Sequence, residues 1–481
     1  MELPLALTFD DVLLQPQESD ILPTEVGTHT NFSRNVRLNI PVASAAMDTV
    51  TESAMAIALA LQGGIGVIHR NFSIEAQVQE VDVVKRSAHG IISDPLTLEP
   101  QDTIADARKL MKEHGISGFP VLEGERAVGI LTKRDLQFQG DDSQKVREIM
   151  TTDLVTASPG TSLDEARSIM AKAKVEKLLL VDAKGDLEGL VTKRDIRMTE
   201  RFPSAAKDVD GRLICGAAIG VHDYERAEAL VHAGVDVLII DTAHGHSGNV
   251  LDTVRELKRR DWVDVVAGNI ATSEAAEALI DAGADGIKVG IGPGSICTTR
   301  IVAGVGVPQF TAIYRASRTA ASNDVPVIAD GGIRHSGDAV KALGAGASSV
   351  MLGSLLAGTD QAPGESFLFK GRSFKAVRGM GSLAAMVEGG KARYGQASVH
   401  ETQKLVPEGI EGMVPSRGPL APFIYQFVGG IRAGMGYIGA DTLEIFRAKA
   451  RFVRITGSGM RESHPHDVRV TKEAPNYWMA D

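Results

Sequence analysis

Cysteine, aromatic residues and long hydrophobic runs are all scarce in this sequence, and each shortage excludes a class of protein. Two cysteines in 481 residues cannot build a disulfide framework, and reduced thiols suit a cytoplasmic compartment. Aromatic residues contribute 5% of the chain, against 51 glycines, a balance that favours Ala-, Val-, Ile- and Gly-rich α/β repeats. No apolar run approaches the roughly 20 residues that span a bilayer, and the first residues contain no basic region typical of a signal peptide. We therefore expect a cytoplasmic protein without a membrane partner.

The chain also lacks an excess of positive charge. Its formal net charge is −10, and no block rich in lysine or arginine offsets it, which argues against a nucleic-acid partner. The proportions of hydrophobic residues (43%) and charged residues (23%) are those of an ordinary globular protein. At 481 residues the chain exceeds one ordinary core, so two or three domains are expected.

Eight short apolar runs recur along the chain, and each ends in small or polar residues. They are residues 41–48, 64–69, 214–219, 237–241, 265–269, 287–290, 327–331 and 350–354. Helical patterns lie between several of them, at 52–61, 224–233, 274–282 and 337–343. Eight strands that alternate with helices predict a (β/α)8 barrel of the α/β class. An open doubly wound sheet shows the same alternation, but eight units that end in polar residues favour closure.

Residues 91–205 interrupt this alternation and contain an internal repeat. Residues 103–111 match 162–170, and the tetrapeptide Thr-Lys-Arg-Asp recurs at 132–135 and 192–195. The repeat resembles a tandem CBS pair (a Bateman module), which implies a regulatory domain that binds adenine or guanine nucleotides. That resemblance points to Thr132, Lys133, Asp135, Thr192, Lys193 and Asp195. The alternative is that the basic residues are merely solvated loop charges. Residues 1–90 and 206–481 would then form the barrel domain, with this insertion in one of its loops.

A glycine-rich loop with one cysteine follows the sixth apolar run. The glycines and the proline of residues 290–294 exclude a helix there and suit a backbone that approaches a ligand closely. Cys297 lies near the tip of this loop, at the C-terminal end of a barrel strand, where this fold places catalysis. It is therefore a candidate nucleophile, whereas Cys215, inside an apolar run, reads as a buried small hydrophobe.

Two further glycine motifs end the seventh and eighth apolar runs. Asp330-Gly331-Gly332 and Gly353-Ser354 occupy the positions at which such barrels bind phosphate. A carboxylate would repel phosphate, so we expect Asp330 to accept hydrogen bonds from ribose hydroxyls. Tight βα turns could explain either motif alone.

Residues 360–481 contain no further βα unit. A long connection with little periodicity is usually disordered or a functional lid. Two amphipathic helices are expected at about 423–435 and 441–450, followed by a strand at 452–455.

Together these motifs resemble the inosine-5′-monophosphate dehydrogenase family over essentially the whole chain. The matching segments are residues 7–14, 47–50, the cysteine loop, 378–382, the inserted repeat and 462–464. The resemblance implies NAD-dependent oxidation of IMP to XMP, the committed step of guanine nucleotide synthesis. Cys297 would attack C2 of the hypoxanthine ring, and a hydride would pass to NAD+. A flap would then enter the vacated nicotinamide site, and water would hydrolyse the thioimidate.

The same resemblance implies roles for individual residues. Arg393 and Tyr394 on the flap would activate water, with Thr299 and Glu408 at supporting proton-transfer positions. The nucleotide would be held by Ser295, Asp330, Gly332, Gly353, Ser354, Gly379, Met380, Gly381 and Glu408, and the NAD+ side by Asp241, Asn269, Gly290 and Gly292. Potassium would bind carbonyls of Gly292, Gly294 and Cys297, completed by Glu462, Ser463 and His464 of a neighbouring subunit. This implies an oligomer, typically a homotetramer, and the sequence does not decide whether octamers form.

Two residues depart from the family pattern. Val377 stands where a tyrosine usually contacts phosphate, and Gly395 replaces the phenylalanine that usually follows Arg-Tyr, which would remove an anchor of the flap. The resemblance favours the dehydrogenase, because the Arg393–Tyr394 flap suits hydrolysis and the inserted repeat usually accompanies that enzyme. Three alternatives are weaker. They are a GMP reductase with the same cysteine loop, a non-catalytic nucleotide sensor, and a less favoured transition-metal site at the histidines of 244–246 and 464–467.

Overall fold

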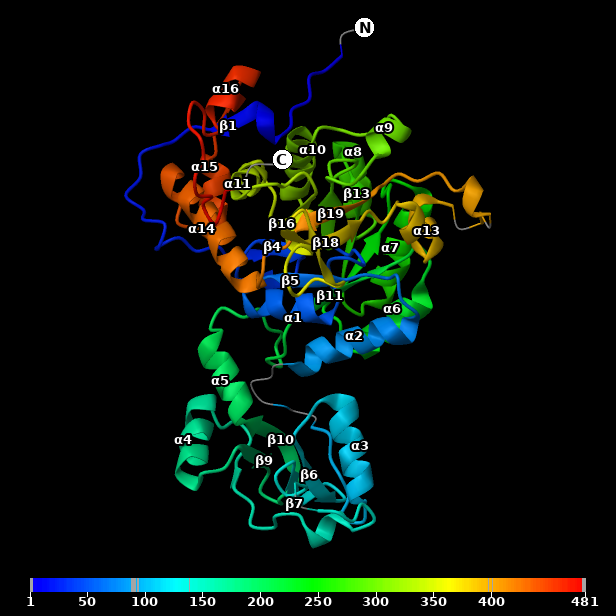
Figure 1. The fold of residues 1–481 in the computed structure, drawn as a ribbon, viewed down its shortest axis with the longest axis vertical. Helices are drawn as coiled ribbons and strands as arrows, with labels where there is room; N and C mark the ends of the chain where they lie inside the picture. Colours follow the sequence, from blue (N-terminus) through cyan, green and yellow to red (C-terminus); the bar gives the residue numbers. More distant parts are fainter. Residues whose placement is uncertain are drawn as a thin grey trace. The chain divides into compact units, whose positions relative to one another are not determined.

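The computed structural model describes residues 3–87, 92, 95–137, 139–396, 398–399 and 401–477. The chain divides into two compact units (Figure 1). The first comprises Met1–Ser87, Ser204–Ala206 and Leu213–Asp481, and the second comprises Ala88–Pro203 and Lys207–Arg212. The expected start of the insertion, residue 91, lies outside the described residues. Among the helices described, none is both long enough and apolar enough to cross a membrane.

Eight parallel strands of the first unit close into a barrel, in the order β11-β12-β13-β14-β15-β16-β4-β5. Their bounds are β4 Val42–Ser44, β5 Ile65–Ile68, β11 Cys215–Ile219, β12 Val237–Asp241, β13 Asp264–Ile270, β14 Gly286–Val289, β15 Val327–Asp330 and β16 Ser349–Leu352. Each coincides with one predicted apolar run, so the closed barrel is confirmed and the open sheet is wrong. Every position in these strands is buried except the last of β15. A strand covered on both faces is apolar throughout, which explains the continuous runs.

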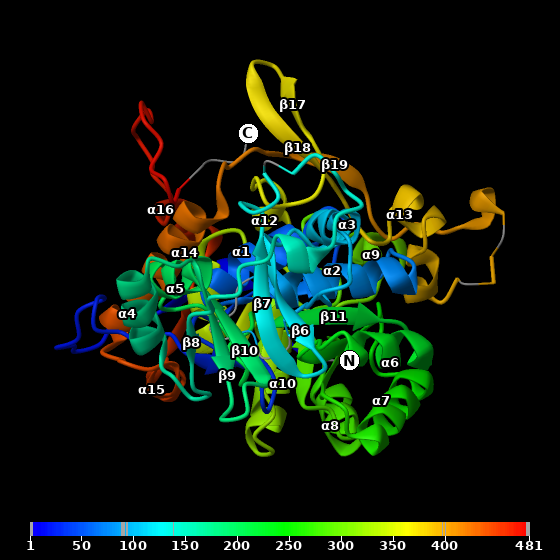
Figure 2. The same ribbon diagram turned by 90° about the horizontal axis from the view of Figure 1, so that it is seen from below.

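Helices surround these strands, as Figures 1 and 2 show for the first unit. The longer ones are α1 Ser53–Leu61, α2 Ile74–Ser87, α6 Tyr224–His232, α7 Gly248–Arg260, α8 Ser273–Asp281, α10 Gln309–Ala321 and α11 Ser336–Gly344. Helix α8 shows how the sequence begins and orients them. The side chain of Thr272 accepts the backbone N–H of Ala275, and Ala275, Ala276 and Leu279 form the buried face. Short helices α9 (Thr299–Val302) and α12 (Ser354–Ala357) follow β14 and β16.

The part of the chain after the eighth barrel strand contains a sheet that the sequence did not predict. Strands β17 (Ser366–Phe369), β18 (Arg372–Arg378) and β19 (Glu411–Pro415) form three antiparallel strands. Figure 2 shows the β17–β18 hairpin standing out from the rest of its unit. Between β18 and β19 lie α13 (Leu383–Val387) and the 3-10 helices η3 (Gly390–Tyr394) and η4 (Thr402–Lys404).

The C-terminal region matches the expected helices and strand. Helices α14 (Leu420–Ile438) and α15 (Leu443–Lys449) precede β20 (Phe452–Arg454) and α16 (Gly457–Glu462). Strand β20 pairs with β1 (Val12–Leu14), which follows η1 (Phe9–Asp11). A further small pair joins β2 (Thr30–Asn31) to β3 (Arg37–Leu38).

The second unit consists of two copies of a small α/β element. The first copy contains α3 (Ile104–His114), β6 (Gly118–Glu123), β7 (Arg126–Thr132) and η2 (Val146–Glu148). The second contains β8 (Thr156–Ala157), α4 (Leu163–Ala173), β9 (Lys177–Val181), β10 (Leu187–Thr192) and α5 (Lys193–Arg201). Each copy has its own apolar core. Helices α3 and α4 begin with the same capping box, Thr103 with Asp106 and Ser162 with Glu165, so the sequence repeat is a structural repeat.

Candidate active site

A cavity of about 140 Å³ lies at the C-terminal ends of the barrel strands. It is lined by the last residue of β12, by Asn269 of β13, by Gly290 after β14 and by Asp330 at the end of β15. The predicted residues that line it are Asp241, Asn269, Gly290, Gly292, Gly294, Cys297, Thr299, Asp330, Gly379, Met380, Gly381, Arg393, Tyr394 and Glu408. The fold therefore brings together residues from the barrel, the cysteine loop and the segment after β18.

Cys297 is held in a loop with defined backbone contacts. Its N–H donates to the carbonyl of Gly294 at 3.1 Å, and the N–H of Thr298 donates to the carbonyl of Glu408 at 2.9 Å. Its Sγ lies 3.2 Å from the hydroxyl oxygen of Thr299, which begins α9. Thr299 and Arg300 already belong to this short helix. Cys215, by contrast, is fully buried inside β11.

Arg393 and Tyr394 of η3 lie inside the cavity. The guanidinium of Arg393 forms an ion pair with Asp241, whose side chain is 4% exposed. The backbone carbonyl of Arg393 accepts the N–H of Ala243. The Tyr394 ring lies against Gly381, where an added Cβ would be 2.7 Å from the phenol oxygen. A larger residue at that position would force the Tyr394 ring to shift. The segment from β18 to β19 thus places two polar side chains beside the nucleophile, at the position predicted for NAD+ contact.

Burial shifts the pKa of three groups near the cavity. It lowers the pKa of the Arg393 guanidinium, although the neighbouring Tyr394 acts in the opposite direction. It raises the pKa of the Tyr394 phenol, which Arg393 partly opposes. Burial also lowers the pKa of Arg70 to about 10, and the positive charge of Arg393 contributes. The site therefore contains an arginine and a tyrosine whose neutral forms are favoured relative to those in water.

Lys288 is a site residue that the sequence reasoning missed. It lies in β14, is 2% exposed, and lines the cavity. Its Nζ contacts Oδ1 of Asp241 at 3.1 Å, Oδ2 of Asp330 at 2.7 Å and the side-chain oxygen of Asn269. A lysine in an otherwise apolar buried strand is the signal that could have revealed it, because a buried ammonium requires partners.

The predicted nucleotide residues occupy the same end of the barrel. Ser295 and Ser354 approach one another, with their hydroxyl oxygens 3.4 Å apart. Gly332 has φ 80°, and an added Cβ there would lie 3.4 Å from Pro293. Gly353 packs against Met47, with 3.2 Å between an added Cβ and the sulfur. Ser295, Gly332, Gly353 and Ser354 do not line the cavity itself.

The predicted potassium ligands are only partly gathered in this chain. Gly292, Gly294 and Cys297 line the cavity. Glu462 ends α16, the hydroxyl of Ser463 donates to the carbonyl of Gly459, and Nδ1 of His464 lies 2.9 Å from the hydroxyl of Tyr477. None of the last three lines the cavity. Among the described residues there is no cluster of three or more His, Cys, Asp or Glu side chains that could hold a transition metal.

The structure explains one of the two residues that depart from the family pattern, Gly395, and places the other, Val377, without explaining it. Val377 is 2% exposed in β18 and pairs in register with Gly412 of β19. Gly395 ends η3 in the left-handed conformation, with φ 70°, which favours glycine over phenylalanine. In the second unit, the Thr132 and Thr192 hydroxyls each donate to the carboxylate of the Asp three residues later, Asp135 and Asp195.

Residues 6–466 match the IMP dehydrogenase / GMP reductase domain. The chain belongs to this family. Among curated relatives, the inosine-5′-monophosphate dehydrogenase of Bacillus subtilis is 55% identical over 481 residues, covering 98% of both chains. That of Rhodopirellula baltica is 55% identical over 477 residues, covering 98% of this chain and 88% of its own. The family membership inferred from the motifs is confirmed, and so is the expectation of an enzyme of the dehydrogenase type.

Solved structures of the family include reductases. A GMP reductase variant from Trypanosoma brucei in complex with guanosine 5′-monophosphate has a TM-score of 0.87 and 44% identity, covering 97% of this chain and 99% of that chain. The same reductase in complex with guanosine 5′-triphosphate has a TM-score of 0.77 and 41% identity, covering 95% of this chain and 99% of that chain. Such coverage includes the inserted unit. The insertion therefore does not separate the dehydrogenases of this family from its reductases.

Proposed function

We propose that the protein oxidises IMP to XMP with NAD+, through a covalent intermediate on Cys297. The observation that carries this proposal is the meeting of Cys297, Thr299, Arg393 and Tyr394 in one cavity. A nucleophile for the first half of the reaction and a water-activating pair for the second half are thus in reach of the same substrate. The curated relatives at 55% identity, which are named inosine-5′-monophosphate dehydrogenase, support this direction over reduction.

The chemistry balances with these groups and two substrates. The Cys297 thiolate adds to C2 of the purine, and the hydride lost from C2 reduces NAD+ to NADH, which leaves a thioimidate. Water then adds to C2 and expels the thiolate, giving XMP and one proton. The neighbouring Thr299 hydroxyl, 3.2 Å from Sγ, can hydrogen-bond the thiolate. A reducing, cytoplasmic compartment would keep Cys297 free for this role.

For the hydrolytic half, Arg393 is the proposed base, assisted by Tyr394. An exposed arginine is too weakly acidic for this, but burial lowers the pKa of Arg393. Thr299 and Glu408 form the second proposed proton path, and the carbonyl of Glu408 accepts the N–H next to the nucleophile. Both routes end at the water that attacks C2.

The IMP and NAD+ sites follow the same geometry. Asp330 would accept the ribose hydroxyls, and Ser295, Gly332, Gly353, Ser354 and the 379–381 segment would hold the rest of the nucleotide. NAD+ would lie beside Asp241, Asn269, Gly290 and Gly292, where it accepts the hydride. Asp241 fits the NAD+ ribose, because an acidic residue at a strand end can accept hydrogen bonds from ribose hydroxyls. In this structure, Arg393 is paired with Asp241, so binding of NAD+ requires η3 to move away.

Potassium would bind carbonyl oxygens of Gly292, Gly294 and Cys297. The turn closed by the Cys297 N–H and the Gly294 carbonyl gathers these hard oxygen donors into a short stretch of chain, which suits such a cation. Glu462, Ser463 and His464 of a neighbouring subunit would complete the site, so we propose a homotetramer or octamer. The cation would hold the cysteine loop in its reactive conformation.

Residues 91–205, nearly all of which belong to the second unit, are the proposed regulatory domain. Adenine or guanine nucleotides would bind at Thr132, Lys133 and Asp135 and at Thr192, Lys193 and Asp195, and shift the enzyme between assemblies. Deleting residues 91–205 should abolish the response of activity to nucleotides while leaving IMP oxidation intact.

The decisive assay mixes IMP, NAD+ and potassium with the wild-type protein and with Cys297→Ala, and follows NADH absorbance and XMP. Cysteine-dependent formation of both products supports the dehydrogenase. GMP reduction by NADPH in place of IMP oxidation would transfer the assignment to a reductase, the candidate favoured by the Trypanosoma brucei structures. Activity in neither direction, with nucleotide binding retained, would indicate a sensor.

A further inference from the structure

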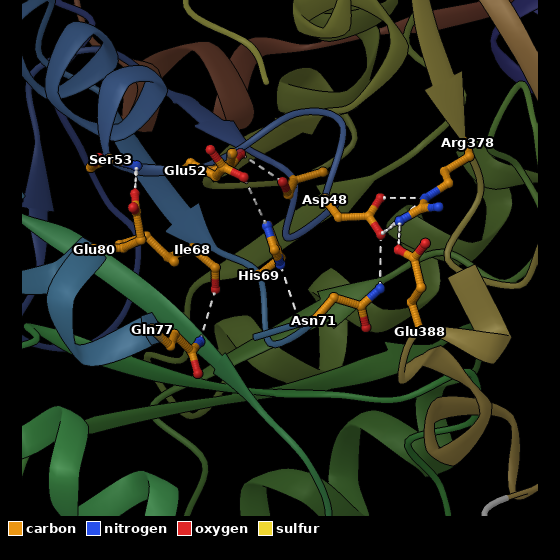
Figure 3. A network of polar contacts seen from close by, with 12 residues as sticks. Asp48, Glu52, Ser53, Ile68, His69, Asn71, Gln77, Glu80, Arg378 and Glu388 are labelled. Carbon is orange, nitrogen blue, oxygen red and sulfur yellow. Dashed lines mark hydrogen bonds and ion pairs between the residues drawn. The ribbon is translucent and has the colours of Figure 1, made fainter. Parts of the chain in front are cut away.

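Arg378 connects two carboxylates that belong to different parts of the first unit (Figure 3). It is the last residue of β18. Its Nε lies 3.1 Å from both carboxylate oxygens of Asp48, and its Nη2 lies 2.7 Å from Oδ2 of the same residue. Nη2 also contacts Oε2 of Glu388, just after α13. These hydrogen bonds raise the pKa of Arg378, so the guanidinium stays charged.

The Asp48 end of this arrangement is fixed. The Asp48 side chain is 7% exposed, and its Oδ2 also accepts the Nδ2–H of Asn71 at 2.8 Å. The backbone N–H of Asn71 donates to Nδ1 of His69 at 3.1 Å. His69 is buried and stacks on Phe72, with ring centroids 4.2 Å apart. The loops after β4 and β5 therefore hold Asp48 in one orientation.

The Glu388 end is exposed. Its side chain is 60% exposed, against 21% for Arg378. An exposed ion pair contributes little and breaks easily, whereas a buried, forked Arg–carboxylate contact persists. The Arg378–Glu388 ion pair should therefore break more readily than the Arg378–Asp48 ion pair.

Each part of the network is close in sequence to residues that line the cavity. Met47, next to Asp48, lines it, and so does the 379–381 segment that follows Arg378. Glu388 immediately precedes the segment that carries Arg393 and Tyr394. Gly389, with φ 136°, packs against Asn71, because an added Cβ there would lie 3.2 Å from Oδ1 of Asn71.

We propose that the Arg378–Glu388 ion pair positions η3 in the cavity, so that Arg393 and Tyr394 reach the intermediate on Cys297. Arg378 and Glu388 are positioning residues, since neither lines the cavity. The pair forms when η3 is inside the cavity and breaks when η3 makes room for NAD+. Arg378 stays bound to Asp48 in both states, so its guanidinium is in place to bind Glu388 when η3 returns to the cavity. This inference rests on the proposed function.

A purely structural role for the pair makes a different prediction. Its loss would then weaken the fold and slow every step alike. A positioning role slows hydrolysis alone, so the covalent intermediate accumulates while hydride transfer keeps its rate.

The test compares the full-length wild type, Glu388→Gln and the matched control Glu401→Gln. Glu401 lies in the same segment and pairs with the exposed Lys404 at 2.6 Å, so the control removes an equivalent surface ion pair. With IMP and NAD+ in excess, stopped flow gives the rate of the first NADH turnover. Acid precipitation of enzyme turning over radiolabelled IMP gives the ratio of covalent adduct to free enzyme.

We expect Glu388→Gln to raise that ratio about two- to fivefold, the range of effects of an exposed ion pair on an equilibrium, with the first turnover unchanged. Arg378→Lys keeps a charge for Asp48 but cannot contact both carboxylates, so it should raise the ratio as well. Adding Glu388→Gln to Arg378→Lys should then have no further effect. An unchanged or lowered ratio in Glu388→Gln, or the same change in Glu401→Gln, would overturn the inference. Absence of NADH from the wild type would instead overturn the proposed function.

Discussion

The Nζ atom of Lys288 lies 2.7 Å from Oδ2 of Asp330 at the base of the cavity. The same ammonium reaches Asp241 and Asn269. One buried cation thus connects the residue expected to bind the IMP ribose with the two expected on the NAD+ side. The three polar strand ends depend on it for their charge balance.

Replacing Lys288 with methionine should therefore impair both stability and substrate binding. The buried Asp241 and the half-buried Asp330 would lose the cation that they share. Removing one partner of a buried pair costs up to about 3–5 kcal/mol, and Arg393, which also pairs with Asp241, offsets part of that cost. Urea unfolding and the KM values for IMP and NAD+ measure the two effects. Lys85→Met is the matched control. Lys85 forms a buried ion pair with Asp236 at 2.8 Å, at the opposite ends of the strands, so it should lower stability with little change in KM. Unchanged KM values in Lys288→Met would contradict the proposed role.

Gly395→Ala should slow hydrolysis. With φ 70° and nothing within 4 Å of an added Cβ, the cost of alanine is the left-handed backbone alone, about 1–2 kcal/mol. That cost applies when η3 is formed, so the adduct should accumulate about tenfold more. Gly418, with φ 71° and equal space, gives the control Gly418→Ala, which should lower stability without raising the adduct. Equal amounts of adduct in both variants would show that the left-handed backbone of Gly395 does not affect the position of η3 in the cavity.

Tyr394 should make stability depend on alkaline pH. Burial raises its pKa, so the folded protein retains the phenol proton after the unfolded chain has lost it. The free energy of unfolding should hold up to about pH 10 and fall above it, by at most about 1.4 kcal/mol per pH unit from this group. Tyr394→Phe should reduce that decline in urea titrations between neutral and alkaline pH. Tyr425→Phe, at an exposed position, should leave it as in the wild type. A decline of equal size in all three proteins would rule out this contribution.

In the second unit, Asp195→Asn should weaken ATP binding. Asp195 is 5% exposed and accepts the Thr192 hydroxyl, so the pair is already arranged to meet ribose hydroxyls. Loss of one charge-assisted hydrogen bond corresponds to about a tenfold rise in Kd, measurable by calorimetry on the full-length protein. Asp164→Asn removes an exposed charge of α4 and should not change the Kd. If Asp195→Asn binds ATP as tightly as the control, the nucleotide site lies elsewhere.

Much of the fold was predictable from local pattern. The barrel strands are buried on both faces, so their apolar runs stand out, and some helices, such as α8 after Thr272, begin with a recognisable cap. The β17–β18–β19 sheet escaped prediction because its strands are mostly exposed and so carry no apolar period. Lys288 escaped because its charge signals burial with partners, but the strand pattern does not show which carboxylates those partners are.

The sequence by itself determined the eight-strand alternation, the repeat of the second unit and the position of Cys297. These features depend on apolar runs and turn residues that are close together in the chain. Only the tertiary structure decided which distant residues meet. It paired Arg393 with Asp241, joined Asp48 to Arg378 and Glu388, and placed Lys288 between the strand ends. Such contacts depend on barrel closure, which brings the carboxyl ends of parallel strands to one face whatever their separation along the chain.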